Sequence, residues 1–254
     1  MTVRERTLFM GGPGTGKTTT LLKIGEYFAT ELKRPVFAID LEDKLEATCE
    51  GEYGKVPDWL NMNIATEGQK QQWEQLRAIS QLIIEKTKPG DCILFDRVDL
   101  SWVAVRRWYS QEKFDKDLAE RMLDSSKAMG KKSAMFTPEF DQGGWEVVGE
   151  NYSSVVLKLV YGFGCNVFMT SGIQDAITPG MDVFAIGVKP RGQPDLAHQP
   201  HSVFLLHQNR EKQKDGKYKT EWLVTTAKDI KGRPTFENEP VNFVTQYLDL
   251  VGVK

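Results

Sequence analysis

An eight-residue segment near the start of the chain combines glycines, a lysine and a threonine in a pattern suited to binding phosphate. The residues are Gly11, Gly12, Pro13, Gly14, Thr15, Gly16, Lys17 and Thr18, which fit G-x-x-x-x-G-K-[ST] at every required position. Glycines let backbone N–H groups surround phosphate oxygens, and a helix that begins at the loop adds a partial positive charge. We therefore predict that this loop, together with Thr19, binds a nucleoside triphosphate. In this prediction Lys17 contacts the β- and γ-phosphates, and the Thr18 hydroxyl is a ligand of Mg²⁺.

The flanks of this segment fit a strand–loop–helix unit. An apolar run at 8–10 precedes it, and a helix-like pattern at 19–24 follows it. A dinucleotide-binding fingerprint fits less well, because Thr19 stands where the third glycine of that fingerprint is required.

An apolar run that ends in an acid provides a candidate metal ligand. The run at 92–95 is followed by Asp96, and an aspartate at the carboxyl end of a parallel strand lies near the phosphate loop of the same sheet. Asp40 follows a similar run at 36–39 and is the alternative. Because the run at 92–95 is the third along the chain, we assign the Mg²⁺ ligand to Asp96.

Hydrolysis of a triphosphate also needs a carboxylate that orients the attacking water. Arg97 follows Asp96, so the chain lacks the acid pair that many motor ATPases have at this point. Glu42 is the next candidate, because neighbouring parallel strands end in the same crevice. On spacing alone, a solvated loop acid is the better interpretation of Glu42.

Apolar runs alternate with helical patterns along most of the chain. Strands are expected at 7–10, 36–39, 92–95 and 166–170, and helices at 18–32, 69–88, 100–132 and 151–161. This alternation predicts a mostly parallel α/β sheet with helices on both faces. Two further strands, at 202–207 and 218–226, flank a polar turn and predict an antiparallel carboxyl-terminal hairpin. We expect one domain over residues 1–254, with irregular stretches at 133–150 and 172–200.

The composition is that of a soluble globular chain. The 254 residues are 40% hydrophobic and 27% charged with a formal net charge of −2, so any contact with DNA requires a local basic patch. Three widely separated cysteines indicate a reducing compartment. No apolar run approaches the ~18 residues of a membrane span, and residues 1–6 are polar. We therefore expect a cytoplasmic protein without membrane contact.

Taken together, the motifs resemble the RecA-type ATPase core. The resemblance rests on the phosphate loop, on the segment 36–42 that ends in Glu42, and on Asp96 without a following acid. It implies a RecA-like P-loop NTPase fold that hydrolyses ATP with Mg²⁺, in which Glu42 activates water. The segment 167–171 occupies the place of a polar sensor, where RecA itself has a glutamine. This implies a sensing role for Thr170 or Ser171, and we count Ser171 with Lys17 and Glu42 among the catalytic candidates.

The chain is also similar to the minimal RecA-core ATPases of bacteriophages, which are linked to recombination and single-strand annealing. The similarity spans roughly residues 5–230 and includes the segment 145–152. It implies action on DNA, single-stranded DNA above all, and assembly into rings or filaments.

The same resemblance places DNA-facing loops at the two irregular stretches. The candidate DNA-binding residues are Lys131 and Lys132, which flank the first stretch, Trp145 within it, and Phe184, Lys189 and Arg191 in the second. Basic side chains neutralise phosphates, and aromatic rings stack on bases. Without the resemblance, solvated surface residues are the better interpretation.

The segment 227–233 resembles the basic finger that RecA-type ATPases extend toward the nucleotide of a neighbouring subunit. Its candidates are Lys228, Lys231 and Arg233, and an exposed basic loop is the alternative.

The sequence therefore predicts a Mg²⁺-dependent ATPase that acts on DNA in recombination, annealing or replication and that assembles with itself. Two other classes stay open. A small-molecule kinase uses the same phosphate loop, and a nucleotide-dependent scaffold would bind ATP with little turnover.

Overall fold

Strands and helices alternate along the chain as the sequence predicts. This computed structural model describes residues 4–66, 68–129, 140–161, 164–175, 187–213, 218–233, 235–240 and 247–248. The strands are β1 Arg6–Gly11, β2 Val36–Asp40, β3 Leu60–Ile64, β4 Cys92–Asp96, β5 Asn166–Ser171, β6 Ile173–Asp175, β7 Val188–Pro190, β8 Ser202–Lys212, β9 Tyr218–Asp229 and β10 Glu239–Pro240. The helices are α1 Lys17–Thr30, α2 Leu45–Tyr53, α3 Gln69–Lys86, α4 Val98–Phe114, α5 Leu118–Met129, α6 Gln142–Tyr152, the π-helical turn Ser153–Leu157, α7 Lys158–Tyr161 and the 3-10 turn Pro194–Ala197.

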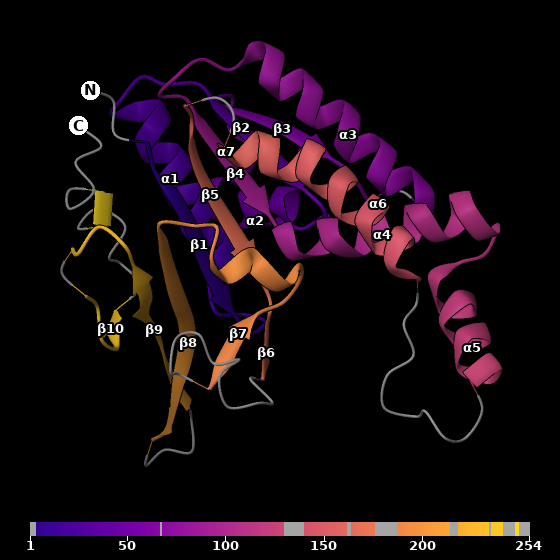
Figure 1. The fold of residues 1–254 in the computed structure, drawn as a ribbon. Helices are drawn as coiled ribbons and strands as arrows, with labels where there is room; N and C mark the ends of the chain where they lie inside the picture. The colour runs from indigo at the N-terminus through magenta and orange to yellow at the C-terminus, as the bar shows by residue number, and fades with distance from the viewer. Residues whose placement is uncertain are drawn as a thin grey trace.

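One sheet holds eight of these strands in the order β10-β9-β8-β1-β5-β4-β2-β3 (Figure 1). Neighbouring strands from β8 to β3 pair in parallel, whereas β8, β9 and β10 pair antiparallel. The predicted class, a mostly parallel α/β sheet with an antiparallel carboxyl-terminal hairpin, is therefore confirmed. Because β1, β5 and β4 are adjacent and parallel, their carboxyl ends lie next to one another at the same end of the sheet.

Alternate side chains of the central strands enter two separate cores. Phe9 and Leu94 belong to the core under α1, whereas Leu8, Met10 and Ile93 belong to the core on the other face. That second core also contains residues of α3, α4 and α6, so helices cover both faces of the sheet (Figure 1). Strands buried on both faces read as nearly continuous apolar runs, which is why the sequence pattern located them.

Two predicted stretches differ from the structure. The stretch at 133–150, expected to be irregular, contains the start of α6. Asp141 caps this helix by accepting a 2.7 Å hydrogen bond from the Gly144 N–H. A Cβ at Gly144 would lie 2.9 Å from Cβ of Phe140, so this glycine serves close packing and not the expected turn. The helix expected at 100–132 is interrupted after α4 by Asp115, whose φ of 51° is left-handed.

The sequence pattern missed α2 and β3, because both elements are short and weakly apolar. The buried residues of α2 are Leu45 and Cys49, and β3 has the sequence LNMNI with Leu60 buried. The pattern also missed the two-stranded sheet of β6 and β7 inside the stretch at 172–200. Of these elements, α2 affects the site most, because it begins shortly after Glu42 in the chain.

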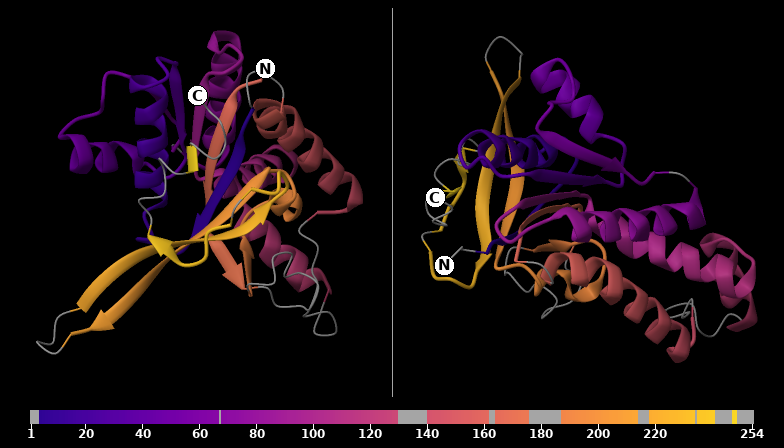
Figure 2. Two further views of the ribbon diagram at one scale, coloured as in Figure 1. Left: turned by 90° about the vertical axis from the view of Figure 1, so that its left-hand side faces the viewer. Right: turned by 90° about the horizontal axis from the view of Figure 1, so that it is seen from above.

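The β8–β9 hairpin is longer than predicted and extends beyond the body of the molecule (Figure 2). Tyr247 belongs to the described part of the carboxyl-terminal tail and is fully packed on its own domain. Its ring meets those of Phe9 and Phe204 edge-on, at centroid distances of 6.4 Å and 5.0 Å. Among the described residues, no helix has the length and apolar character that crossing a bilayer requires.

Gly25 tests how closely α1 packs on the sheet. A Cβ at Gly25 would lie 2.9 Å from Cδ1 of Leu94 and 3.0 Å from Cζ3 of Trp59. We expect Gly25→Val to lower the free energy of unfolding by about 1–3 kcal/mol, because overpacking displaces these neighbours.

The matched control is Gly51→Ala in α2, where a Cβ would meet nothing within 4 Å. Here the loss of a helical glycine should raise the free energy of unfolding by about 0.5–1 kcal/mol. Denaturant unfolding measures both variants, and a Gly25→Val protein as stable as the wild type would contradict the close packing.

Candidate functional site

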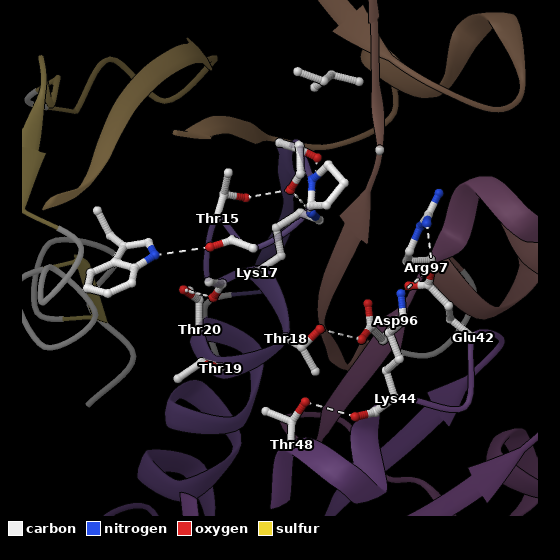
Figure 3. A pocket seen from close by; sticks show the side chains of 18 of the residues that line it. Thr15, Lys17, Thr18, Thr19, Thr20, Glu42, Lys44, Thr48, Asp96 and Arg97 are labelled. Carbon is white, nitrogen blue, oxygen red and sulfur yellow. Dashed lines mark hydrogen bonds and ion pairs between the residues drawn. The ribbon is translucent and has the colours of Figure 1, made fainter. Parts of the chain in front are cut away.

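A cavity of about 830 Å³ opens where the carboxyl ends of the parallel strands meet (Figure 3). Residues 11–20, which form the phosphate loop and the first turn of α1, line one side of this cavity. The other walls include Glu42, Asp96, Arg97, Arg191 and Trp222. A cavity of this size is in the range of about 300–1,000 Å³ that holds small-molecule ligands.

The predicted phosphate loop wraps around the start of α1. Gly14 and Gly16 have φ values of 72° and 83°, which glycine adopts without the steric cost that a side chain would add. Thr15 Oγ1 donates a 2.9 Å hydrogen bond to the carbonyl of Gly12 and holds the loop closed. The first N–H groups of α1 therefore lie at the loop, where they can bind an anion.

Lys17 contributes the positive charge of this loop. Its ammonium group donates hydrogen bonds of 3.0 Å and 2.7 Å to the carbonyl oxygens of Gly11 and Gly12. Burial, and then the nearby charge of Arg97, lowers the pKa of Lys17 below its ordinary value. An anionic ligand would relieve both effects, because it supplies the missing negative charge.

Asp96 lies at the end of β4, with both carboxylate oxygens in hydrogen bonds. Oδ2 accepts a 2.8 Å bond from Thr18 Oγ1, and Oδ1 accepts a bond from Thr170 Oγ1 (Figure 3 shows the first of these). The side chain is 1% exposed, and this burial raises the pKa of Asp96 above its ordinary value, with the neighbouring acids Asp40 and Glu42 adding to the effect. A desolvated carboxylate beside a hydroxyl offers the hard oxygen ligands that Mg²⁺ prefers. Thr18 and Asp96 therefore fit the predicted metal site.

Glu42 lies across the cavity from the loop, in two ion pairs that the sequence did not reveal. Its Oε1 is 2.7 Å from Nη1 of Arg97 and 2.9 Å from Nζ of Lys44. Burial alone would raise the pKa of Glu42, but the contacts with Lys44 and Arg97 outweigh it and hold the pKa below its ordinary value. Arg97 is fixed in turn by Asp99, whose hydrogen bonds raise the pKa of the guanidinium. The position thus holds an ionised carboxylate, and the interpretation as a free loop acid does not fit it.

Asp40, the alternative metal ligand, has a structural role. It is fully buried, and its two oxygens accept four backbone hydrogen bonds. The donors are the N–H groups of Glu42 at 2.8 Å, Asp43 at 3.0 Å, Lys44 at 2.9 Å and Leu45 at 2.8 Å. Asp40 therefore shapes the loop that presents Glu42 and begins α2, which favours Asp96 as the metal ligand.

The end of β5 reaches the site through Thr170. Ser171 Oγ lies 2.8 Å from the carbonyl oxygen of Gly172 and 3.3 Å from that of Arg191, whereas Thr170 contacts Asp96. Both side chains are fully buried. These contacts favour Thr170 over Ser171 for the predicted sensing position.

Two residues of the carboxyl-terminal hairpin hold the phosphate loop from outside. The carbonyl of Gly14 accepts a 3.0 Å hydrogen bond from Trp222 Nε1 and a second from Gln208 Nε2. Gln208 and Trp222 are paired across β8 and β9. Because C=O and the following N–H of a trans peptide point in opposite directions, these donors fix the Gly14–Thr15 peptide with the Thr15 N–H pointing away from the hairpin. The sequence analysis had located the strand of Trp222 but not this contact.

The predicted DNA-binding residues have different surroundings. Arg191 lines the cavity, and its Nε donates a 2.8 Å hydrogen bond to the carbonyl of Ile173. Lys189 lies beside it on β7. The remaining candidates Lys131, Lys132 and Phe184 are outside the described residues.

The placement of Trp145 in a DNA-facing loop is wrong. Trp145 lies in α6, its ring stacks on Trp102 at a centroid distance of 6.3 Å, and it packs against Phe140 at 5.1 Å. Trp145 therefore packs against the protein from a helix that the sequence pattern did not predict.

The three finger candidates lie where β9 ends, at the opposite end of the strands from the cavity. Arg233 and Lys231 form ion pairs with the fully buried Glu5, and Lys228 Nζ donates to the carbonyls of His198 and Pro200. They therefore do not line the cavity of their own chain, and their action on a neighbouring subunit stays a prediction.

No family model and no curated protein matches this chain. Among solved structures, it is similar to a KaiC-like protein from the hyperthermophilic archaeon Pyrococcus horikoshii OT3. The two chains are 14% identical, with a TM-score of 0.47, over 92% of this chain and 82% of the other.

Asp96→Asn tests the burial of the metal-ligand candidate. Because the pKa of Asp96 is raised in the folded chain, its ionisation lowers the free energy of unfolding at every pH above the unfolded value of about 4. In the presence of a chelator, we expect Asp96→Asn to be more stable than the wild type at neutral pH, with the difference shrinking as the pH falls toward about 4. Denaturant unfolding across this pH range measures the difference.

Asp58→Asn, at a side chain that is 91% exposed, is the control and should show no such pH-dependent gain. If Asp96→Asn is less stable than the wild type at neutral pH, burial of the ionised Asp96 carboxylate does not destabilise the folded chain, which contradicts the raised pKa.

Trp222→Phe tests the contact between the hairpin and the phosphate loop. The variant keeps an aromatic ring but loses the N–H that holds the Gly14 carbonyl. We expect the affinities for ATP and for inorganic tripolyphosphate to fall together, by about 2- to 10-fold, the range that one hydrogen bond contributes. Calorimetry with both ligands measures this. A loss confined to ATP would contradict a role in shaping the phosphate loop and would place the indole against the nucleoside.

Proposed function

We propose that this chain is a Mg²⁺-dependent ATPase with a RecA-like core. One observation carries the proposal: the same cavity joins the phosphate loop with Lys17, the hydrogen-bonded pair of Thr18 and Asp96, and the ionised Glu42. These are the parts that hydrolysis of a bound triphosphate requires, namely an anion cradle, a metal site and a water-activating carboxylate.

Each part has its own task in this mechanism. The N–H groups of the loop and Lys17 bind the β- and γ-phosphates. Thr18 and Asp96 hold Mg²⁺, which neutralises charge on the phosphate oxygens when bound. Thr170, hydrogen-bonded to Asp96 from the neighbouring strand, fixes the orientation of that carboxylate.

Glu42 orients the attacking water and accepts its proton. Its pKa lies below the ordinary value, so it is a carboxylate at neutral pH. Both of its ion pairs with described residues fall on Oε1, which leaves Oε2 as the acceptor for a water proton. Proton acceptance by a positioned carboxylate contributes about 10²- to 10⁴-fold to a rate.

We further propose that the ATPase acts on single-stranded DNA in recombination, annealing or replication and works as a ring or filament. The resemblance of its motifs to the RecA-type core supports this role. In such an assembly Lys228, Lys231 or Arg233 would serve the nucleotide of a neighbouring copy, after Lys231 and Arg233 leave their ion pairs with Glu5 and Lys228 leaves the carbonyls of His198 and Pro200. Lys189 and Arg191 would contact DNA beside the nucleotide cavity.

Glu42→Gln is the variant that tests the mechanism. The amide keeps the size of the side chain but cannot accept the proton, so we expect hydrolysis to fall by about 10²- to 10⁴-fold. Nucleotide affinity should stay close to that of the wild type, because the phosphate loop is untouched. Steady-state phosphate release and equilibrium nucleotide binding measure the two effects.

Glu46→Gln, at an exposed acid of α2 outside the cavity lining, is the matched control and should hydrolyse ATP at the wild-type rate. Full activity in Glu42→Gln would remove Glu42 from the mechanism and would favour a scaffold or a kinase.

A further inference from the structure

The β8–β9 hairpin carries a surface that the ATPase site does not use. Residues directly opposite each other in an antiparallel pair project from the same face of the sheet. The register pairs Gln208 with Trp222, Arg210 with Thr220, and Lys212 with Tyr218. These six residues thus form one continuous face of the hairpin, which we call the ribbon strip.

The ribbon strip combines positive charge with exposed aromatic rings. Arg210 and Lys212 are exposed, and Tyr218 and Trp222 are 64% and 47% exposed. None of the six residues is acidic. Such large rings are normally shielded from water, so their exposure beside two cations indicates a ligand that offers both phosphates and flat apolar faces.

The acids of the same hairpin lie on its other face. Glu211 is paired with Lys219 in the register, and Glu221 with Asn209. Lys219 is also in a 2.6 Å ion pair with Glu221, which neutralises that face locally. Among the described residues of the hairpin, the net positive charge therefore lies on the ribbon strip.

The position of the strip links it to the cavity. The hairpin extends beyond the body of the molecule, so the strip is open along its length (Figure 2). At its inner end, Gln208 and Trp222 contact the Gly14 carbonyl of the phosphate loop. From Gln208 to Lys212 the strip is about 13 Å long, since a strand rises about 3.3 Å per residue. This length matches roughly four stacked nucleotides at about 3.4 Å each.

We propose that the ribbon strip binds single-stranded nucleic acid. Arg210 and Lys212 contact backbone phosphates, and Tyr218 stacks on a base. A single strand is the form that fits, because its bases offer free faces to an exposed ring, whereas a duplex hides them in its own stack. The inference rests on the proposed action on DNA and gives it a surface separate from Lys189 and Arg191.

This surface also provides a physical link between nucleic acid and nucleotide. Gln208 and Trp222 belong both to the ribbon strip and to the contact that orients the phosphate loop. A strand that presses on either side chain therefore changes the binding of a triphosphate, and by linkage a triphosphate changes the affinity for the strand by the same factor.

The test is fluorescence anisotropy of short labelled oligothymidylate and oligouridylate with the full chain. Lys212→Ala and Lys219→Ala form a matched pair, because each removes one positive charge near the same end of the hairpin but from opposite faces. We expect Lys212→Ala to weaken binding and to lower the slope of log affinity against log salt by about 0.7, the value for one phosphate contact on a single strand. Lys219→Ala should keep the wild-type slope.

Tyr218 tests the stacking contact in the same assay. Tyr218→Ala should weaken binding by roughly 5- to 100-fold, and Tyr218→Phe should restore it, because the ring and not the hydroxyl makes the contact. A preference of the wild type for oligothymidylate supports the proposed action on DNA, whereas a preference for oligouridylate would contradict that action and identify RNA as the strand.

Three outcomes would overturn the inference, and they are distinguishable from one another. Absence of oligonucleotide binding by the wild type overturns both the strip and the proposed action on DNA. Wild-type binding with equal slopes in Lys212→Ala and Lys219→Ala overturns the strip alone. If Lys212→Ala and Tyr218→Ala bind normally but change the oligomeric state in light scattering, the strip is an interface between copies of this chain.

Discussion

The buried carboxylate of Asp96 is the constraint on which the rest of the site depends. It is 1% exposed, its pKa is raised by burial, and the hydroxyls of Thr18 and Thr170 account for its hydrogen bonds. Two hydroxyls do not balance a desolvated negative charge, so the site calls for a cation at this point. The parallel pairing of β1 with β5 and of β5 with β4 holds these three residues together, since each follows or ends a strand at the same edge. This strand order thus brings the proposed metal ligands next to the phosphate loop.

The acids at that end of the sheet have separate roles. Asp40 ends β2, and its carboxylate oxygens accept hydrogen bonds from four backbone N–H groups. Asp40 therefore shapes the loop, whereas Glu42 is the acid that this loop presents to the cavity. Glu42 is held ionised by Lys44 and Arg97, and Arg97 directly follows Asp96. The acid proposed to bind the metal and the acid proposed to activate water are therefore kept in opposite electrostatic environments, one buried with a raised pKa and one paired with a lowered pKa.

The sequence predicted the parts of the site that have local signals. The phosphate loop and the buried strands are short patterns of residue type, and both were located, as was the antiparallel hairpin. The ion pair of Glu42 with Arg97 joins residues 55 apart in the chain, and the bond from Gln208 to Gly14 joins residues 194 apart, so no local pattern could reveal them. The error at α6 has a physical cause as well: the stretch at 133–150 was expected to be irregular, whereas Gly144 lies inside a helix, where its lack of a side chain allows close packing.

The proposed function is hydrolysis of ATP in this cavity in response to single-stranded DNA. The most direct measurement is steady-state ATP hydrolysis by the full chain with and without single-stranded DNA, with Lys17→Ala as the blank. We predict Mg²⁺-dependent hydrolysis that single-stranded DNA stimulates and that Lys17→Ala abolishes. Hydrolysis that single-stranded DNA leaves unchanged, hydrolysis that Lys17→Ala leaves intact, or a purified chain that neither binds nor hydrolyses ATP would contradict this function.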